Sequence, residues 1–98
     1  MKQVQLIFSK KVLLENEQSM QLDYCLMESI SEDEHATPYY GVQISKYLGD
    51  TVEKDEIAGL SSSREEAVAI LEKLYQFDVT PISMVEIVDE LAEQVLLV

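Results

Sequence analysis

The sequence predicts an α+β domain, a three- to four-stranded, mainly antiparallel meander followed by two C-terminal helices packed on one face. Two observations lead to this fold class. Apolar and polar residues alternate through most of residues 1–60, as strands require, whereas residues 61–98 repeat apolar residues at helical spacing. A chain of 98 residues suffices for one domain with one core, built from a strand-rich half (1–60) and a two-helix unit (61–98).

The first helix begins after three consecutive serines that are followed by acidic residues. A capping box is possible in two registers, Ser62 with Glu65 or Ser63 with Glu66. The two carboxylates also suit the positive end of the helix dipole. Behind this start, one side of the predicted helix carries Ala67, Val68, Ile70, Leu71, Leu74 and Tyr75.

The second helix is predicted to start at Pro81, with Thr80 as its N-cap, because proline at the first helical position loses no hydrogen bond. The connection between the helices is short, which indicates an αα-hairpin or a steeply crossed pair. One side of this helix carries Met84, Ile87, Val88, Leu91, Ala92 and Val95.

The first two strands are predicted over residues 3–14 and 20–27, joined by a tight turn at residues 16–18. Lys10 interrupts the apolar face of the first strand, and a bulge is predicted near Ser9 and Lys10. The residues predicted to face the core are Val4, Leu6, Phe8, Val12 and Leu14 in the first strand and Met20, Leu22, Tyr24 and Leu26 in the second.

A polar loop over residues 31–38 separates the second strand from a third, predicted over residues 39–48 with Tyr40, Val42 and Ile44 inward. A turn at Gly49 and Asp50 leads to a weaker fourth strand, residues 51–60. Val52, Ala58 and Leu60 are predicted to face the core there. Four consecutive charges at residues 53–56 favour an edge position, because charges discourage further strand pairing.

The charge balance argues against nucleic acid and membrane surfaces as partners. The chain has 19 acidic and 7 basic residues, a net charge of −12. Such a surface repels phosphate backbones and anionic lipids. A decoy that imitates nucleic acid is a further hypothesis, but sequence does not show the spacing of acids that it requires. There is no secretory signal and no membrane-spanning run, so we expect a complete, soluble cytoplasmic protein.

No catalytic, cofactor-binding or metal-binding residue is predicted. His35 lies beside Glu32, Asp33 and Glu34, but there is no second histidine and the spacing matches no calcium loop, so a solvated loop is expected. Cys25 lies within a predicted strand and is expected to be a structural thiol.

A protein-interaction surface is predicted on the sheet face that the helices leave open. By alternation this face carries the apolar residues Ile7, Leu13, Met27, Tyr39 and Tyr47, together with Cys25. The C-terminal residues 95–98 add further apolar surface. The expected partner is another protein or a second copy of the chain, with a homodimer slightly favoured. The alternative function is a small enzyme or ligand-binding protein with a pocket between sheet and helices.

The chain resembles a family of short clostridial and other Firmicute proteins classed as a domain of unknown function. The resemblance rests on the order and spacing of four segments, residues 40–44, 57–61, 79–81 and 85–91. The resemblance covers roughly residues 39–98. It implies a bacterial cytosolic protein of this size, with no known activity, cofactor or site residue. The function is therefore unknown from the sequence, and a non-enzymatic interaction or regulatory module is the preferred hypothesis.

Overall fold

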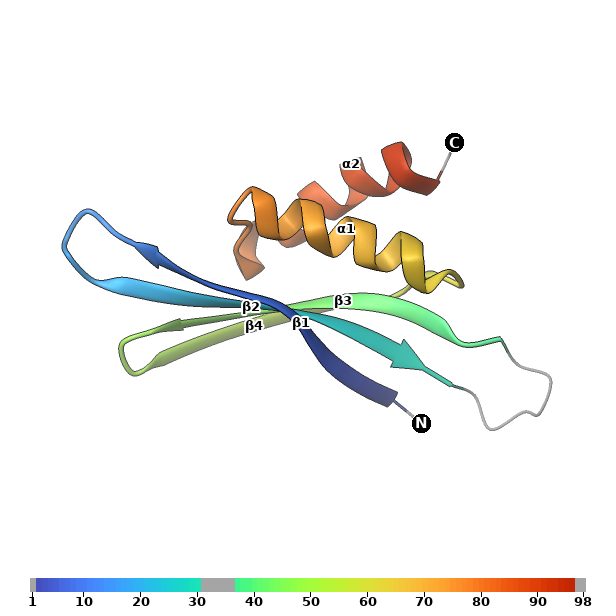
Figure 1. Cartoon of the computed structure of the whole chain (residues 1–98), viewed down its shortest axis with the longest axis horizontal. Helices are drawn as coiled ribbons and strands as arrows, with labels where there is room; N and C mark the ends of the chain where they lie inside the picture. Colours follow the sequence, from blue (N-terminus) through green and yellow to red (C-terminus); the bar gives the residue numbers. More distant parts are fainter. Residues whose placement is uncertain (1, 31–36, 97–98) are drawn as a thin grey trace.

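The computed structural model of the protein describes residues 2–30 and 37–96, with side chains described as far as Leu91. The elements follow one another as β1 (Lys2–Leu13), β2 (Ser19–Ser29), β3 (Tyr39–Leu48), β4 (Thr51–Ser61), α1 (Arg64–Gln76), a short 3₁₀ turn η1 (Pro81–Ser83) and α2 (Met84–Leu96) (Figure 1).

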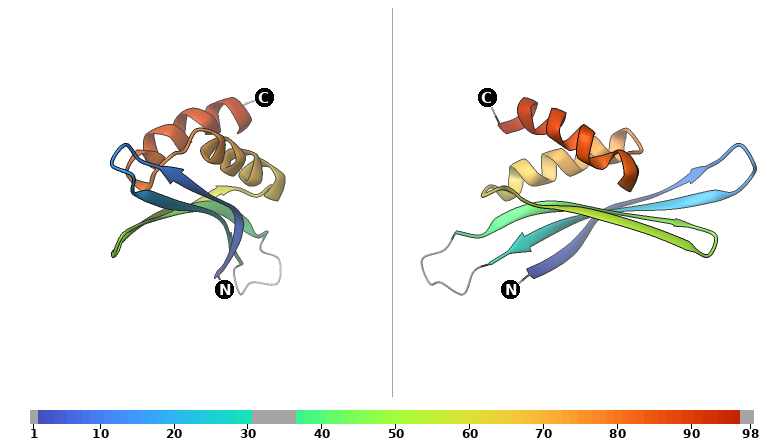
Figure 2. Two further views of the ribbon diagram at one scale, coloured as in Figure 1. Left: turned by 60° about the vertical axis from the view of Figure 1, so that its left-hand side comes forward. Right: turned by 180° about the vertical axis from the view of Figure 1, so that it is seen from behind.

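The four strands form one antiparallel sheet in the order β1-β2-β3-β4, and both helices lie on the same face of it (Figures 1 and 2). The predicted α+β fold is thus confirmed, as is the edge position of β4. The domain is elongated, measuring 51 × 29 × 18 Å. The β1–β2 and β3–β4 hairpins extend together beyond the helices at one end (Figure 1).

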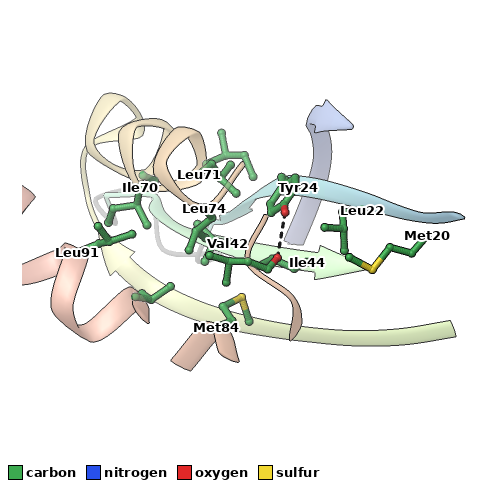
Figure 3. Close-up of a cluster of buried hydrophobic side chains, with 14 residues drawn as sticks. Met20, Leu22, Tyr24, Val42, Ile44, Ile70, Leu71, Leu74, Met84 and Leu91 are labelled. Carbon is green, nitrogen blue, oxygen red and sulfur yellow. Dashed lines mark hydrogen bonds between the residues drawn. The ribbon is translucent and has the colours of Figure 1, made fainter. Parts of the chain in front are cut away.

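The core lies between the sheet and the two helices. Leu71 of α1 and Leu91 of α2, predicted to pack on the sheet face with Leu6, Leu22, Val42 and Ile44, are buried in one cluster with the last three of these. Leu6 is 56% exposed and does not belong to it. Each buried leucine stabilises the fold by about 1.5–3 kcal/mol through removal of apolar surface from water. The same cluster contains Met20, Tyr24, Leu26, Ala67, Ile70, Leu74, Val79, Met84 and Val88 (Figure 3).

A bulge at Ile7 changes which side chains of β1 face the core. Leu6 pairs with Cys25 and Phe8 with Tyr24, so Ile7 is the extra residue. A single extra residue reverses the facing of everything before it. The predicted inward positions of Val4 and Leu6 are therefore wrong, because the bulge lies before Phe8 rather than near Ser9 and Lys10.

A second bulge bends β4 across the sheet. Tyr40 pairs with Ser61 and Val42 with Ile57, so residues 58–60 lie opposite Gly41 alone. A Cβ atom on Gly41 would lie 2.2 Å from the Ile57 carbonyl oxygen, a distance at which only glycine fits. Leu60 packs against the core as predicted, but Val52 and Ala58 are exposed, which corrects their predicted inward position.

The start of α1 uses the second of the two predicted registers. The Glu66 backbone N–H donates to the Ser63 side chain at 3.3 Å. The Glu66 carboxylate does not bond the Ser63 N–H directly. Instead, that N–H donates to the Ser61 hydroxyl (2.9 Å), which in turn donates to Glu66 (2.6 Å). The Ser61 hydroxyl thus connects the Ser63 N–H to the Glu66 carboxylate.

The end of α1 is a Schellman motif centred on Asp78, which adopts a positive φ of 53°. The Val79 N–H donates to the Leu74 carbonyl at 3.0 Å and the Asp78 N–H to the Tyr75 carbonyl at 3.4 Å. Thr80 then leads into η1 with extended backbone, but its side chain makes no capping hydrogen bond. The expectation that the Thr80 hydroxyl caps the second helix is therefore wrong.

Candidate interaction surface

The open face is the side of the sheet that points away from both helices, and the strand pairing gives its members. They are Lys2, Val4, Leu6, Ser9, Lys11 and Leu13 of β1; Ser19, Gln21, Asp23, Cys25, Met27 and Ser29 of β2; Tyr39, Gly41, Gln43, Ser45 and Tyr47 of β3; and Val52, Lys54 and Glu56 of β4.

Apolar side chains are exposed at six positions of the open face, each with between 39% and 76% of its surface accessible. These are Val4, Leu6, Leu13, Tyr39, Tyr47 and Val52. Tyr47 and Val52 pair directly across β3 and β4, and Tyr47 also pairs with Gln21 of β2. A sheet face covered by nothing usually carries polar side chains, so this group is an unusual feature of the surface.

Of the five residues predicted for this surface, Leu13, Tyr39 and Tyr47 lie on the open face and are exposed. Met27 lies on the same face but is only 1% exposed. Ile7 packs against the core on the opposite side. Its predicted place on the open face is wrong because Ile7 is the extra residue of the β1 bulge. The side chains of residues 95–98 lie outside the described part of the chain.

The sheet curls toward the open face at the end where β1 begins. The Lys2 ammonium lies 2.9 Å from the Glu56 carboxylate, although β1 and β4 are the two edge strands and are separated by β2 and β3. Only a curled sheet brings its edges within reach of one side chain. The curl explains why Met27, Cys25 and Ser45 are buried on a face that no helix covers.

Polar side chains of the open face form hydrogen bonds with one another. Asp23 accepts hydrogen bonds from the Ser9 hydroxyl (2.7 Å) and the Gln21 amide (3.0 Å). Glu56 accepts from Lys2 and, at 3.4 Å, from Gln43. The hydrogen bond from Lys2 is the main reason that the pKa of Glu56 lies below its ordinary value. The face carries three cations, Lys2, Lys11 and Lys54, against the carboxylates of Asp23 and Glu56.

Cys25 is buried on this face, and burial is the main cause of the raised pKa of its thiol. The neighbouring Asp23 raises this pKa further, and Lys54 partly opposes the effect. A raised pKa keeps the sulfur protonated at neutral pH, whereas the thiolate is the nucleophilic form. The environment of Cys25 therefore matches the structural thiol that the sequence predicts.

Among residues 2–30 and 37–96, no three or more His, Cys, Asp or Glu side chains come together as a metal would require. The loop with His35, Glu32, Asp33 and Glu34 lies outside these residues. In the described part of the chain, no helix has the length and apolar character needed to cross a membrane.

Sequence reasoning missed Val4, Leu6 and Val52 as surface residues. One signal for the first two was present: Leu6, Ile7 and Phe8 are three consecutive apolar residues in a strand that otherwise alternates. Such a run is a place where one residue can be extra, and so where the two faces exchange. For Val52 a local signal was present too, since the two-residue turn at Gly49 and Asp50 places it opposite Tyr47, a residue predicted to face outward.

A family model described as "Family of unknown function (DUF6514)" matches residues 3–94 of the chain. The match includes the strand-rich half, which the resemblance noted from the sequence did not cover. No curated protein matches the chain, and no solved structure matches it.

Proposed function

The chain belongs to DUF6514, a family of unknown function, and from the geometry of its open face we propose that it is a non-enzymatic protein-interaction module. The observation that carries this proposal is the set of six exposed apolar side chains on the face opposite the helices. Two of them are tyrosines, whose amphipathic rings are common anchors of protein interfaces. The bacterial cytosol is the setting that this proposal assumes.

The contrast between the two faces of the sheet supports the proposal. On the helix side, apolar side chains from all four strands pack into or against one cluster with α1 and α2. On the open face, Leu13, Tyr47 and Val52 lie toward the hairpin ends, which extend beyond the helices. A partner can therefore reach these side chains without displacing either helix.

The alternative of an enzyme or ligand-binding protein requires a pocket between sheet and helices. That space is occupied by the buried side chains of the core, among them Leu22, Ile44, Leu71 and Met84 (Figure 3). The buried Tyr24 hydroxyl there donates to the Val79 carbonyl at 3.0 Å and so already has its partner. This packing favours the interaction module.

Crosslinking of lysines in cells of the native host tests the proposal, because the position of each crosslinked lysine shows which face of the protein contacts another polypeptide. Lys11 and Lys54 lie on the open face, and the exposed Lys73 of α1 is a control of the same chemistry on the helix side. We expect crosslinks to other polypeptides at Lys11 and Lys54 in excess of those at Lys73. Crosslinks equal at all three lysines, or concentrated at Lys73, would contradict an interaction through the open face.

A further inference from the structure

We propose that the occupant of the open face is a second copy of this chain, with two sheets packed face to face around a two-fold axis and the helices pointing outward. This inference rests on the proposed function, since it names the partner of the same surface. It commits to a closed, symmetric dimer, because a two-fold contact uses the same patch on both copies.

Charge is the first argument for a second copy. Two chains that each carry −12 repel one another wherever acidic surfaces meet. The open face has one more cation than carboxylates, so all of the net negative charge of the chain lies elsewhere. Both helices have a net negative charge. In sequence, α1 has three acidic and two basic residues, and α2 has four acidic residues and no basic one. Contact through the open face places these helices farthest apart.

The face also carries both signs of charge in positions that a two-fold axis can match. Lys11 and Lys54 have no ion-pair partner within 4.0 Å among the described residues, whereas Asp23 is held only by the neutral Ser9 and Gln21. In a symmetric dimer, a lysine of each copy approaches Asp23 of the other, so that each such contact occurs twice. A partner with a strongly basic surface would instead leave Lys11 and Lys54 opposite like charge.

The size of the face is the second argument. Four strands about 4.8 Å apart and about ten residues long make a face of roughly 600 Å². Two such faces bury at most roughly 1,200 Å², and less where the curl already buries Cys25, Met27 and Ser45, so the contact is of the size of a weak, reversible interface. Twisted sheets pack face to face readily, as β-sandwiches do, with their strands inclined by about 30°.

The test measures the association of the full chain by sedimentation equilibrium over a wide concentration range. We expect a monomer–dimer equilibrium between 11.1 kDa and twice that mass, with Kd in about the micromolar range. Salt screens both the lysine–Asp23 attractions and the repulsion between two chains of charge −12, and because the repulsion involves far more charges, raising the salt concentration is expected to strengthen the dimer. A dimer that weakens with salt would contradict the charge argument.

Matched substitutions locate the contact. Val52→Glu adds a carboxylate to the open face at a side chain that is 58% exposed, and Val85→Glu makes the same change on α2 at one that is 49% exposed. We expect Val52→Glu to weaken the dimer roughly tenfold or more and Val85→Glu to leave it within about twofold. Circular dichroism melts of both variants, expected within about 0.5 kcal/mol of the parent, establish that they are folded.

Two results would overturn the inference. One is a monomer at every concentration; the other is a dimer that tolerates Val52→Glu and is lost in Val85→Glu. The first result leaves the proposed function standing if Lys11 and Lys54 still crosslink to a different protein in the host. If those crosslinks are absent as well, the proposed function fails together with the inference.

Discussion

The side-chain ammonium of Lys10 on β1 lies 2.7 Å from the carbonyl oxygen of Tyr75 at the C-terminal end of α1. The same ammonium forms an ion pair with Asp78 and lies 4.4 Å from the centre of the Tyr75 ring. The Lys10 ammonium is a second, charged donor to a carbonyl that already accepts from the Asp78 N–H, and a cation here also favours the negative end of the helix dipole. Lys10, which interrupts the apolar face of its strand, thus ties the sheet to the turn between the helices.

Replacement of Lys10 by methionine is expected to lower the free energy of unfolding by about 1–2 kcal/mol, because a hydrogen bond from a charged donor is lost while the apolar stem is kept. Urea denaturation measures the change. Lys11→Met is the matched control, since the neighbouring lysine is exposed on the open face and should change stability by less than about 0.5 kcal/mol. Equal effects of the two substitutions would show that Lys10 contributes nothing specific.

Gly41→Ala is expected to destabilise the protein by about 1–3 kcal/mol or more. The added Cβ would lie 2.2 Å from the Ile57 carbonyl and 2.8 Å from the Ala58 Cα, both backbone atoms of the β4 bulge. Gly49→Asn is the control, because Gly49 has a positive φ of 57° that asparagine tolerates and no atom lies within 4 Å of its Cβ position. Thermal melts that rank Gly49→Asn as the more damaging change would contradict the close approach at Gly41.

The two helix starts should respond differently to alanine. Ser63→Ala removes the acceptor of the Glu66 N–H and should cost about 1 kcal/mol. Thr80→Ala should cost less than about 0.5 kcal/mol, because the Thr80 side chain caps nothing. Chemical denaturation of both variants decides between this order and the reverse, which is the order expected if the Thr80 hydroxyl were a cap.

Tyr24 should make the stability of the protein fall at alkaline pH. Burial is the main cause that raises the pKa of the Tyr24 hydroxyl, and the charge of Asp78 raises it further. A raised folded-state pKa means that the contribution to stability is complete below the pKa of an unfolded tyrosine, about 10, and is lost as the pH rises above it. The phenol must stay protonated to donate to the Val79 carbonyl.

Denaturation midpoints measured from neutral pH to above pH about 10 test whether Tyr24 causes the alkaline loss of stability. Tyr24→Phe should be less stable by about 1–2 kcal/mol at neutral pH, because the Val79 carbonyl loses its donor, and should show a shallower alkaline decline than the parent. Tyr39→Phe, on the exposed open face, should match the parent in both respects. A parent and a Tyr24→Phe variant with parallel pH profiles would assign the alkaline decline to other groups.

Local patterns in the sequence are enough to predict the elements of this fold. The period of two in residues 1–60, the period of 3.6 after Ser63 and the serine and proline signals at the helix starts are local, and the structure has four strands and two helices where they indicate. The core positions of the central strands followed too, since Leu22, Tyr24, Val42 and Ile44 lie in β2 and β3, which pair with each other without interruption.

The facing of the edge strands, and with it most of the candidate surface, depends on how the strands pair in three dimensions. Whether Ile7 or Lys10 is the extra residue of β1 depends on its pairing with β2, and Leu60 faces the core while Val52 does not because the irregular stretch opposite Gly41 lies between them. One residue of slip reverses a whole face. Met27 shows the same dependence, because its burial comes from the curl that brings Lys2 to Glu56 across the sheet, a contact over 54 residues of chain that no local pattern encodes.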